Sequence, residues 1–208
     1  MPKIVDHEQR RRELAEALWR VIADSGPDAV SIRSVAAEAG LSTGALRHYF
    51  QTREELLVFA MDLAEQRVAD RVRAHMAAQD PAATMVERVA GLVEQLLPLD
   101  DTRLAEYRAW EAAGTLGEHD TGRELRWHKQ REFYRSLVAA LAGVAVEDPA
   151  RVHPDTLVEE WSEHLHTYVD GIALQLVVTP SVVGADGVRA RLRTFLGRIE
   201  AALNRPDA

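Results

Sequence analysis

Residues 42 to 49 combine small side chains, hydroxyl groups and an arginine at helical spacing. Thr43–Ala45 are all small, so a helix that begins here can bring its backbone close to another molecule. Arg47 lies one turn further on, and an arginine can pair bidentately with guanine. Ser42, Tyr49 and the helix N-terminus are suited to phosphate contacts. These residues predict recognition of a DNA major groove.

Two predicted helices and a tight turn position these side chains. Ser31–Ala39 and Ser42–Tyr49 each begin at a serine, which is a good N-cap. Gly40 lies between them, where a left-handed glycine commonly ends a helix. This pattern is typical of a helix-turn-helix, whose second helix enters the major groove. We expect Leu46 and Phe50, four residues apart, to anchor that helix to a core.

Helical periodicity continues along the rest of the chain, and no stretch has a convincing β alternation. Thr52 and Glu55 form a capping-box pattern that begins the fourth helix. The sequence therefore predicts an all-α fold of about nine helices. They are Asp6–Ser25, Ser31–Ala39, Ser42–Tyr49, Thr52–Ala78, Ala83–Leu97, Thr102–Gly114, Thr121–Leu141, Pro154–Val178 and Ala185–Asn204.

The stretch Ser31–Leu57, including its Tyr-Phe-x-x-Arg-Glu-Glu-Leu-Leu sequence, resembles the N-terminal signature of the TetR/AcrR family of transcriptional regulators. The resemblance implies an all-α homodimer with a DNA-binding domain over residues 1–53. It also implies that residues 54–208 bind an effector and dimerise. Many members have an aromatic residue where Arg47 stands. The Arg-His-Tyr-Phe form and Tyr168–Gln175 are closer to the branch that includes the choline-responsive repressor.

The same resemblance assigns a DNA face residue by residue. The matching positions are Arg33, Ser42, Thr43, Gly44, Ala45, Arg47, His48, Tyr49 and Arg53. Arg53 stands where the family commonly has a phosphate-contacting lysine. Arg47 adds a hydrogen-bond donor where the aromatic residue is more usual, so the operator sequence is left open.

The C-terminal helices carry aromatic and polar side chains suited to a small-molecule pocket, although large aromatics are also common in cores. The pocket candidates are Tyr107, Arg108, Trp110, Glu111, Trp127, His128, Trp161, His164 and Tyr168. By resemblance, the last two helices form the dimer interface, although their apolar stripes also suit core packing. The interface candidates are Leu165, Val169, Gly171, Ile172, Leu192, Phe195 and Leu196.

Two Glu-His pairs at i, i+4 spacing could supply metal ligands. They are Glu124 with His128 and Glu160 with His164. The Glu-x-x-His spacing of carboxylate-bridged bundles is absent, so solvated helix charges are the better interpretation. We expect no metal and no cofactor.

Composition bounds the class of protein. The 208 residues are 47% hydrophobic and include no cysteine, which excludes disulfides and thiol catalysis. We expect a soluble cytoplasmic protein, because no signal-peptide or transmembrane pattern is present. The formal charge is −8, yet residues 1–53 hold eight basic and seven acidic side chains. The N-terminal part is thus less acidic than the rest.

These observations predict a one-component regulator that binds a palindromic operator as a homodimer. We expect a repressor that a small-molecule effector releases from DNA, although the sequence leaves activation open. A helical adaptor without DNA binding is the alternative. An enzyme is the least favoured class, since no nucleophile–base pair, phosphate-binding glycine loop or paired-carboxylate signature is present.

Overall fold

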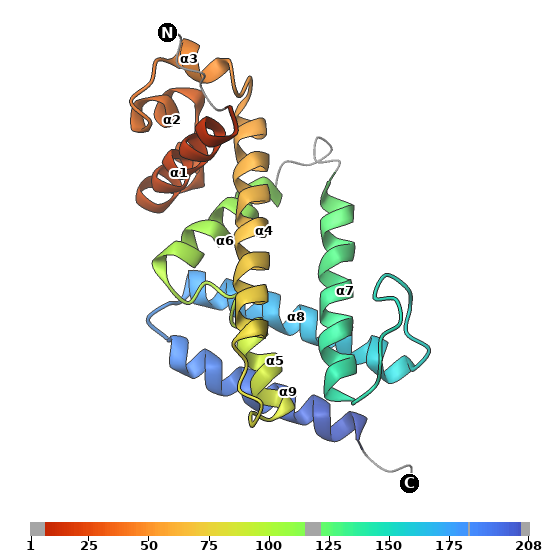
Figure 1. Cartoon of the computed structure of the whole chain (residues 1–208). Helices are drawn as coiled ribbons and strands as arrows, with labels where there is room; N and C mark the ends of the chain where they lie inside the picture. The colour runs from red at the N-terminus through yellow and green to blue at the C-terminus, as the bar shows by residue number, and fades with distance from the viewer. Residues whose placement is uncertain (1–6, 115–121, 183, 205–208) are drawn as a thin grey trace. The chain divides into compact units, whose positions relative to one another are not determined.

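The computed structural model describes residues 7–114, 122–182 and 184–204. Within these ranges all regular elements are helical, as predicted (Figure 1). The predicted helix starts at Asp6 and Thr121 lie outside them. The elements are α1 (His7–Ser25), the 3-10 turn η1 (Pro27–Ala29), α2 (Ile32–Glu38), α3 (Thr43–Arg47), α4 (Arg53–Ala77), α5 (Met85–Val93), α6 (Asp101–Gly114), α7 (Arg123–Leu141), α8 (Thr156–Val178) and α9 (Ala185–Leu203).

Two helices are shorter than predicted. α3 ends at Arg47, because the backbone N–H groups of His48 and Tyr49 each donate to a carbonyl three residues earlier, at 3.3 and 2.9 Å. Such i to i+3 bonds tighten the chain into a turn. α5 ends at Val93, because the N–H groups of Gln95 and Leu96 also donate to carbonyls three residues earlier, at 3.1 and 3.0 Å.

The chain forms two compact units. Unit 1 comprises Met1–Asp70 with Asp100–Asp120, and unit 2 comprises Arg71–Leu99 with Thr121–Ala208. The residues of α4 are therefore divided between the two, and α6 belongs to unit 1 although it lies in the middle of the sequence. The functional division between residues 53 and 54 stays a prediction.

Unit 1 is built around one apolar core shared by α1, α2, α3, α4 and α6. Leu46 and Phe50, the predicted anchors of α3, are 0% and 1% exposed. Three alanines of α6, Ala109, Ala112 and Ala113, complete the core. Their small side chains let α6 pack closely on α1.

In unit 2, α7 packs on α8, while α8 and α9 run antiparallel side by side (Figure 1). A buried ion pair holds the connection between α7 and α8. Arg135 is 6% exposed, and its Nη2 donates to Glu159 Oε2 at 3.0 Å. Arg135 also donates to the Pro149 carbonyl, and the backbone N–H of His153 donates to Glu159 Oε1 at 2.6 Å. Hydrogen bonds from Arg135 and His153 lower the pKa of Glu159, against the opposing effect of its burial.

Candidate functional site

The predicted helix-turn-helix is formed by α2, α3 and the turn between them. Ser31 and Ser34 cap α2 reciprocally, each side-chain oxygen accepting from the other's backbone N–H at 3.0 and 2.9 Å. Gly40 has φ 67°, a left-handed conformation that side chains other than glycine rarely adopt. This glycine lets the chain reverse, and Leu41 N–H then donates to the Ala36 carbonyl at 2.8 Å.

The turn leaves most of α3 exposed. Ser42 caps the helix by accepting from Ala45 N–H at 3.1 Å, and Leu46 is the side chain that α3 buries. Gly44 does not meet a close neighbour on its Cβ side, so packing does not require glycine there. The chain after α3 is fixed by Gln51, whose side-chain amide donates to the Arg47 carbonyl at 2.6 Å.

The predicted DNA face divides by exposure. Six of these residues are exposed, namely Arg33, Ser42, Thr43, Gly44, Arg47 and His48. Ala45, Tyr49 and Arg53 are half-buried. The geometry is that of a short helix whose inner face is locked and whose outer face carries hydroxyl, imidazole and guanidinium groups. Such a surface can donate hydrogen bonds to base edges and phosphates.

Arg53 is held by its own protein. Its Nε donates to the Val30 carbonyl at 2.9 Å, and its Nη2 donates to the Pro27 carbonyl at 2.9 Å. These bonds fasten the start of α4 to the connection between α1 and α2. Nη1 of the guanidinium takes no part in these two bonds, and the phosphate contact of Arg53 stays a prediction.

The predicted pocket residues come from helices of both units, and their shared role stays a prediction. Tyr107, Arg108, Trp110 and Glu111 lie on α6 in unit 1, where the Tyr107 and Trp110 ring centroids are 6.1 Å apart. The others belong to unit 2 and lie in two groups. Trp127 and His128 are exposed on α7. Trp161, His164 and Tyr168 lie on α8 with Phe195 of α9.

A buried polar cluster between α7 and α8 was not predicted. Tyr134 stacks on His166, with ring centroids 4.7 Å apart, and both residues are buried. His166 Nε2 lies 3.4 Å from Asp170 Oδ2, and the ring of Trp127 lies 6.2 Å from His166. The i, i+4 spacing of His166 and Asp170 is a sequence signal that could have indicated the pair.

Burial controls the protonation of this cluster. Burial lowers the pKa of His166, and Arg131 adds to that effect while Asp170 opposes it. Burial also raises the pKa of Tyr134, with a smaller contribution from Asp170. His166 therefore favours its neutral form and Tyr134 stays a phenol. The cluster presents aromatic faces beside Asp170, whose side chain is 55% exposed.

The predicted dimer residues are largely interior. Leu165, Val169, Ile172, Leu192 and Leu196 are at most 4% exposed within the single chain. Their side chains pack within unit 2, which agrees with core packing, the alternative interpretation of these apolar stripes. Phe195 and Gly171 are half-exposed.

Among the described residues, no group of three or more His, Asp or Glu side chains is arranged to hold a metal ion. Glu124 and His128 form an exposed pair, with Oε1 and Nε2 3.7 Å apart. A search of the same residues finds no helix with the length and hydropathy needed to span a membrane.

A packed helix-turn-helix with an exposed second helix, followed by a helical body, defines a DNA-binding transcriptional regulator. Residues 14–58 match the family model for bacterial regulatory proteins of the tetR family. Residues 85–200 match the model for the BetI-type transcriptional repressor C-terminal domain. The chain belongs to the TetR family, which consists of transcriptional regulators and not of enzymes.

Individual relatives extend this match over nearly the whole chain. The HTH-type transcriptional regulator PksA of Bacillus subtilis (strain 168) is 34% identical, covering 97% of this chain and 93% of PksA. A transcriptional regulator from Rhodococcus sp. Rha1 has a similar structure, with 26% identity, a TM-score of 0.72, and coverage of 95% and 99% of the two chains. The multidrug binding protein EbrR, in complex with imidazole, shares 26% identity with a TM-score of 0.64, over 96% of this chain and 97% of EbrR.

Proposed function

We propose that this regulator is a repressor that binds a palindromic operator as a homodimer and is released by a small-molecule effector. The observation that carries the proposal is α3, which is anchored by Leu46 and Phe50 and exposes Arg47. Residues 1–53 would carry the DNA contacts, and residues 54–208 would carry effector binding and dimerisation. Because its partner is chromosomal DNA, we assign the protein to the bacterial cytoplasm.

Dimerisation through α8 and α9 is supported by the aromatic side chains that these helices leave partly exposed. Tyr168 stacks on Phe195 with ring centroids 3.9 Å apart, and Trp161 lies 6.3 Å from Phe195. All three are half-buried in one chain, so a second copy can cover the remaining surface. Two recognition helices held about 34 Å apart would reach successive major grooves.

The α7–α8 cluster supports a small organic cation as the effector. Aromatic faces attract cations, and the exposed Asp170 carboxylate supplies the opposite charge. Trp127 is 47% exposed and has the Arg131 guanidinium over its ring, with Cζ 5.2 Å from the centroid, so this ring already accepts a cation, while His166 and Tyr134 are buried beside it. An effector that binds one spacing of the DNA-binding domains better than another shifts the dimer's population away from the operator.

The test begins with selection of duplexes from a random pool by the wild-type protein. The selected duplex is then titrated with Arg47→Ala and with Arg151→Ala, a matched control at an exposed arginine of unit 2. A bidentate guanine contact gives about 1–3 kcal/mol of discrimination, and a dimer makes two, so we expect Arg47→Ala to lose at least roughly 30-fold in affinity. Arg151→Ala should bind like the wild type.

Two results would contradict the proposal at different levels. Unchanged affinity of Arg47→Ala would remove that residue from the recognition surface. Failure to enrich any duplex sequence would overturn operator recognition itself and favour the helical adaptor.

A further inference from the structure

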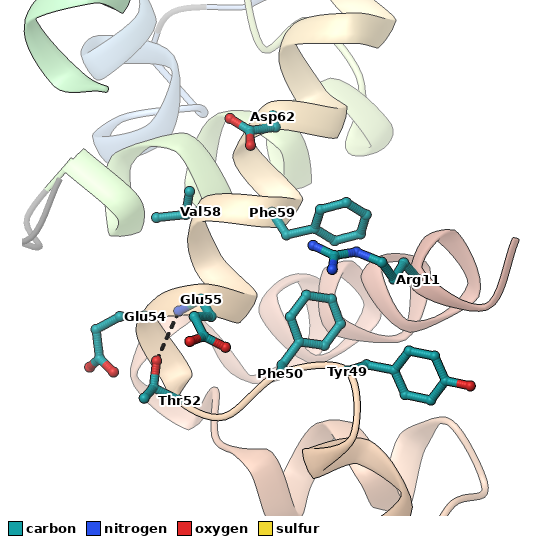
Figure 2. A pocket seen from close by; sticks show the side chains of 9 residues that line it. All are labelled: Arg11, Tyr49, Phe50, Thr52, Glu54, Glu55, Val58, Phe59 and Asp62. Atoms are coloured by element: carbon teal, nitrogen blue, oxygen red, sulfur yellow. Dashed lines mark hydrogen bonds between the residues drawn. The ribbon is translucent and has the colours of Figure 1, made fainter. Parts of the chain in front are cut away.

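The guanidinium of Arg11, on α1, lies against two phenylalanine rings that also contact each other (Figure 2). Its Cζ is 5.0 Å from the ring centroid of Phe50 and 4.4 Å from that of Phe59. The two ring centroids are 5.3 Å apart. Phe50 follows the turn after α3, and Phe59 belongs to α4, so one guanidinium of α1 contacts two other parts of unit 1.

Arg11 is partly buried at the edge of the core. Arg11 borders an open hollow of about 490 Å³ whose lining includes three carboxylates, Glu54, Glu55 and Asp62. Its Nε is buried and has no hydrogen-bond partner among the described residues. Among the described residues, the guanidinium thus contacts the faces of Phe50 and Phe59, and the acidic lining is unfavourable for an approaching phosphate.

Phe50 connects Arg11 to the end of α3. The N–H of Phe50 donates to the Leu46 carbonyl at 3.1 Å, one residue before Arg47. The next residue, Gln51, donates from its backbone to Glu55 Oε2 at 2.7 Å and from its side chain to the Arg47 carbonyl. These bonds tie Phe50 and Gln51 to the last turn of α3, which carries Arg47.

We propose that Arg11 is a positioning residue for operator recognition, which sets the orientation of α3 through Phe50 and Phe59 without touching DNA. This inference rests on the proposed function, in which α3 reads the operator. A cation that lies against both rings favours their present positions, because the attraction depends on the distance to each ring centroid. Loss of the cation removes this contribution from the buried pair of Phe50 and Phe59.

The experiment compares Arg11→Met, Arg11→Lys and Arg12→Met. Methionine keeps an unbranched apolar stem without the charge, and lysine restores a cation. Arg12, exposed on the same helix, is the matched control. Each full-length protein is titrated with the duplex selected by the wild type and with a scrambled duplex, at several salt concentrations. Thermal unfolding is measured in parallel, and titrations are made well below the unfolding temperature.

We expect Arg11→Met to lose roughly tenfold in affinity for the selected duplex and to keep its affinity for the scrambled one. The salt slope should not change, Arg11→Lys should recover part of the loss, and Arg12→Met should keep the wild-type ratio of selected to scrambled affinity. A salt slope that falls by about one per subunit would identify a phosphate contact and overturn the proposal.

An unchanged affinity ratio, with or without a lower unfolding temperature, would show a merely structural role and also overturn it. Arg47→Ala separates this failure from failure of the proposed function. If Arg47→Ala loses the selected duplex while Arg11→Met retains it, the positioning role alone is wrong. If Arg47→Ala also retains it, the assignment of α3 residues fails as well.

Discussion

The guanidinium of Arg67 lies over the indole ring of Trp19, with its Cζ 3.8 Å from the ring centroid. Arg67 also pairs with Glu16, and its Nη1 lies 3.5 Å from Oε1 of Glu106. Trp19 and Glu16 belong to α1, Arg67 to α4 and Glu106 to α6. One side chain therefore joins three helices of unit 1, including the one that comes from the middle of the sequence.

Replacing Arg67 with methionine is expected to destabilise the protein by about 1–3 kcal/mol, because Glu106 is 4% exposed and would lose a charged partner. The loss of unfolding free energy should be smaller than for a fully buried ion pair, since 35% of the Arg67 side chain is exposed. Urea unfolding at a fixed protomer concentration measures it.

The double variant Arg67→Met with Glu106→Gln is the control for that interpretation. Removing the negative charge of Glu106 should recover part of the stability, because the buried charge that Arg67 contacts is then absent. A double variant as unstable as the sum of the two single variants would show that Glu106 is not the reason for the loss.

Local rules predicted most of the secondary structure. Ser31, Gly40 and Ser42 mark helix ends through short-range hydrogen bonds and a left-handed backbone, and the structure confirms these ends. The placement of α6 could not be predicted this way. Ala109 and its neighbours pack on α1, and that contact depends on residues far apart in sequence.

The candidate sites were predicted to different degrees. The side chains predicted to face DNA lie within one continuous stretch, so a sequence motif is enough to propose them. The cluster of Tyr134, His166 and Asp170 depends on how α7 crosses α8, which helical periodicity does not define. Periodicity also does not separate the two sets of α8 residues. Leu165, a predicted interface residue, lies in the core, whereas Tyr168, a predicted pocket residue, is partly exposed.

His166 should make stability depend on pH below its ordinary pKa of 6.5. Burial lowers the pKa of His166 in the folded protein, so below pH 6.5 the unfolded chain binds more protons at this site than the folded chain does. Stability should therefore fall as the pH drops from 6.5 toward the lowered value. The groups that face the imidazole are Tyr134 and Arg131 on α7 and Asp170 on α8. Urea unfolding across this range measures the effect.

His166→Phe isolates the contribution of this side chain, because phenylalanine fills similar space and does not titrate. The variant should lose part of the wild-type decline in stability between pH 6.5 and lower values. His128→Phe, a change at an exposed histidine of α7, should keep it. Parallel pH curves for the wild type and His166→Phe would contradict the assignment.

Phe195→Glu is expected to convert the dimer into monomers, because it places a charge on the aromatic surface that a second copy would cover. Phe195 is half-exposed and stacks on Tyr168, so one chain can solvate the new carboxylate and stay folded. Sedimentation equilibrium measures the association, and operator affinity should fall with it, since a single recognition helix reads half a palindrome.

Leu192→Ala is the contrast. Leu192 is fully buried in unit 2, so this change should lower the free energy of unfolding by about 2–5 kcal/mol and act on association only through folding. A folded, fully dimeric Phe195→Glu protein would place the interface elsewhere.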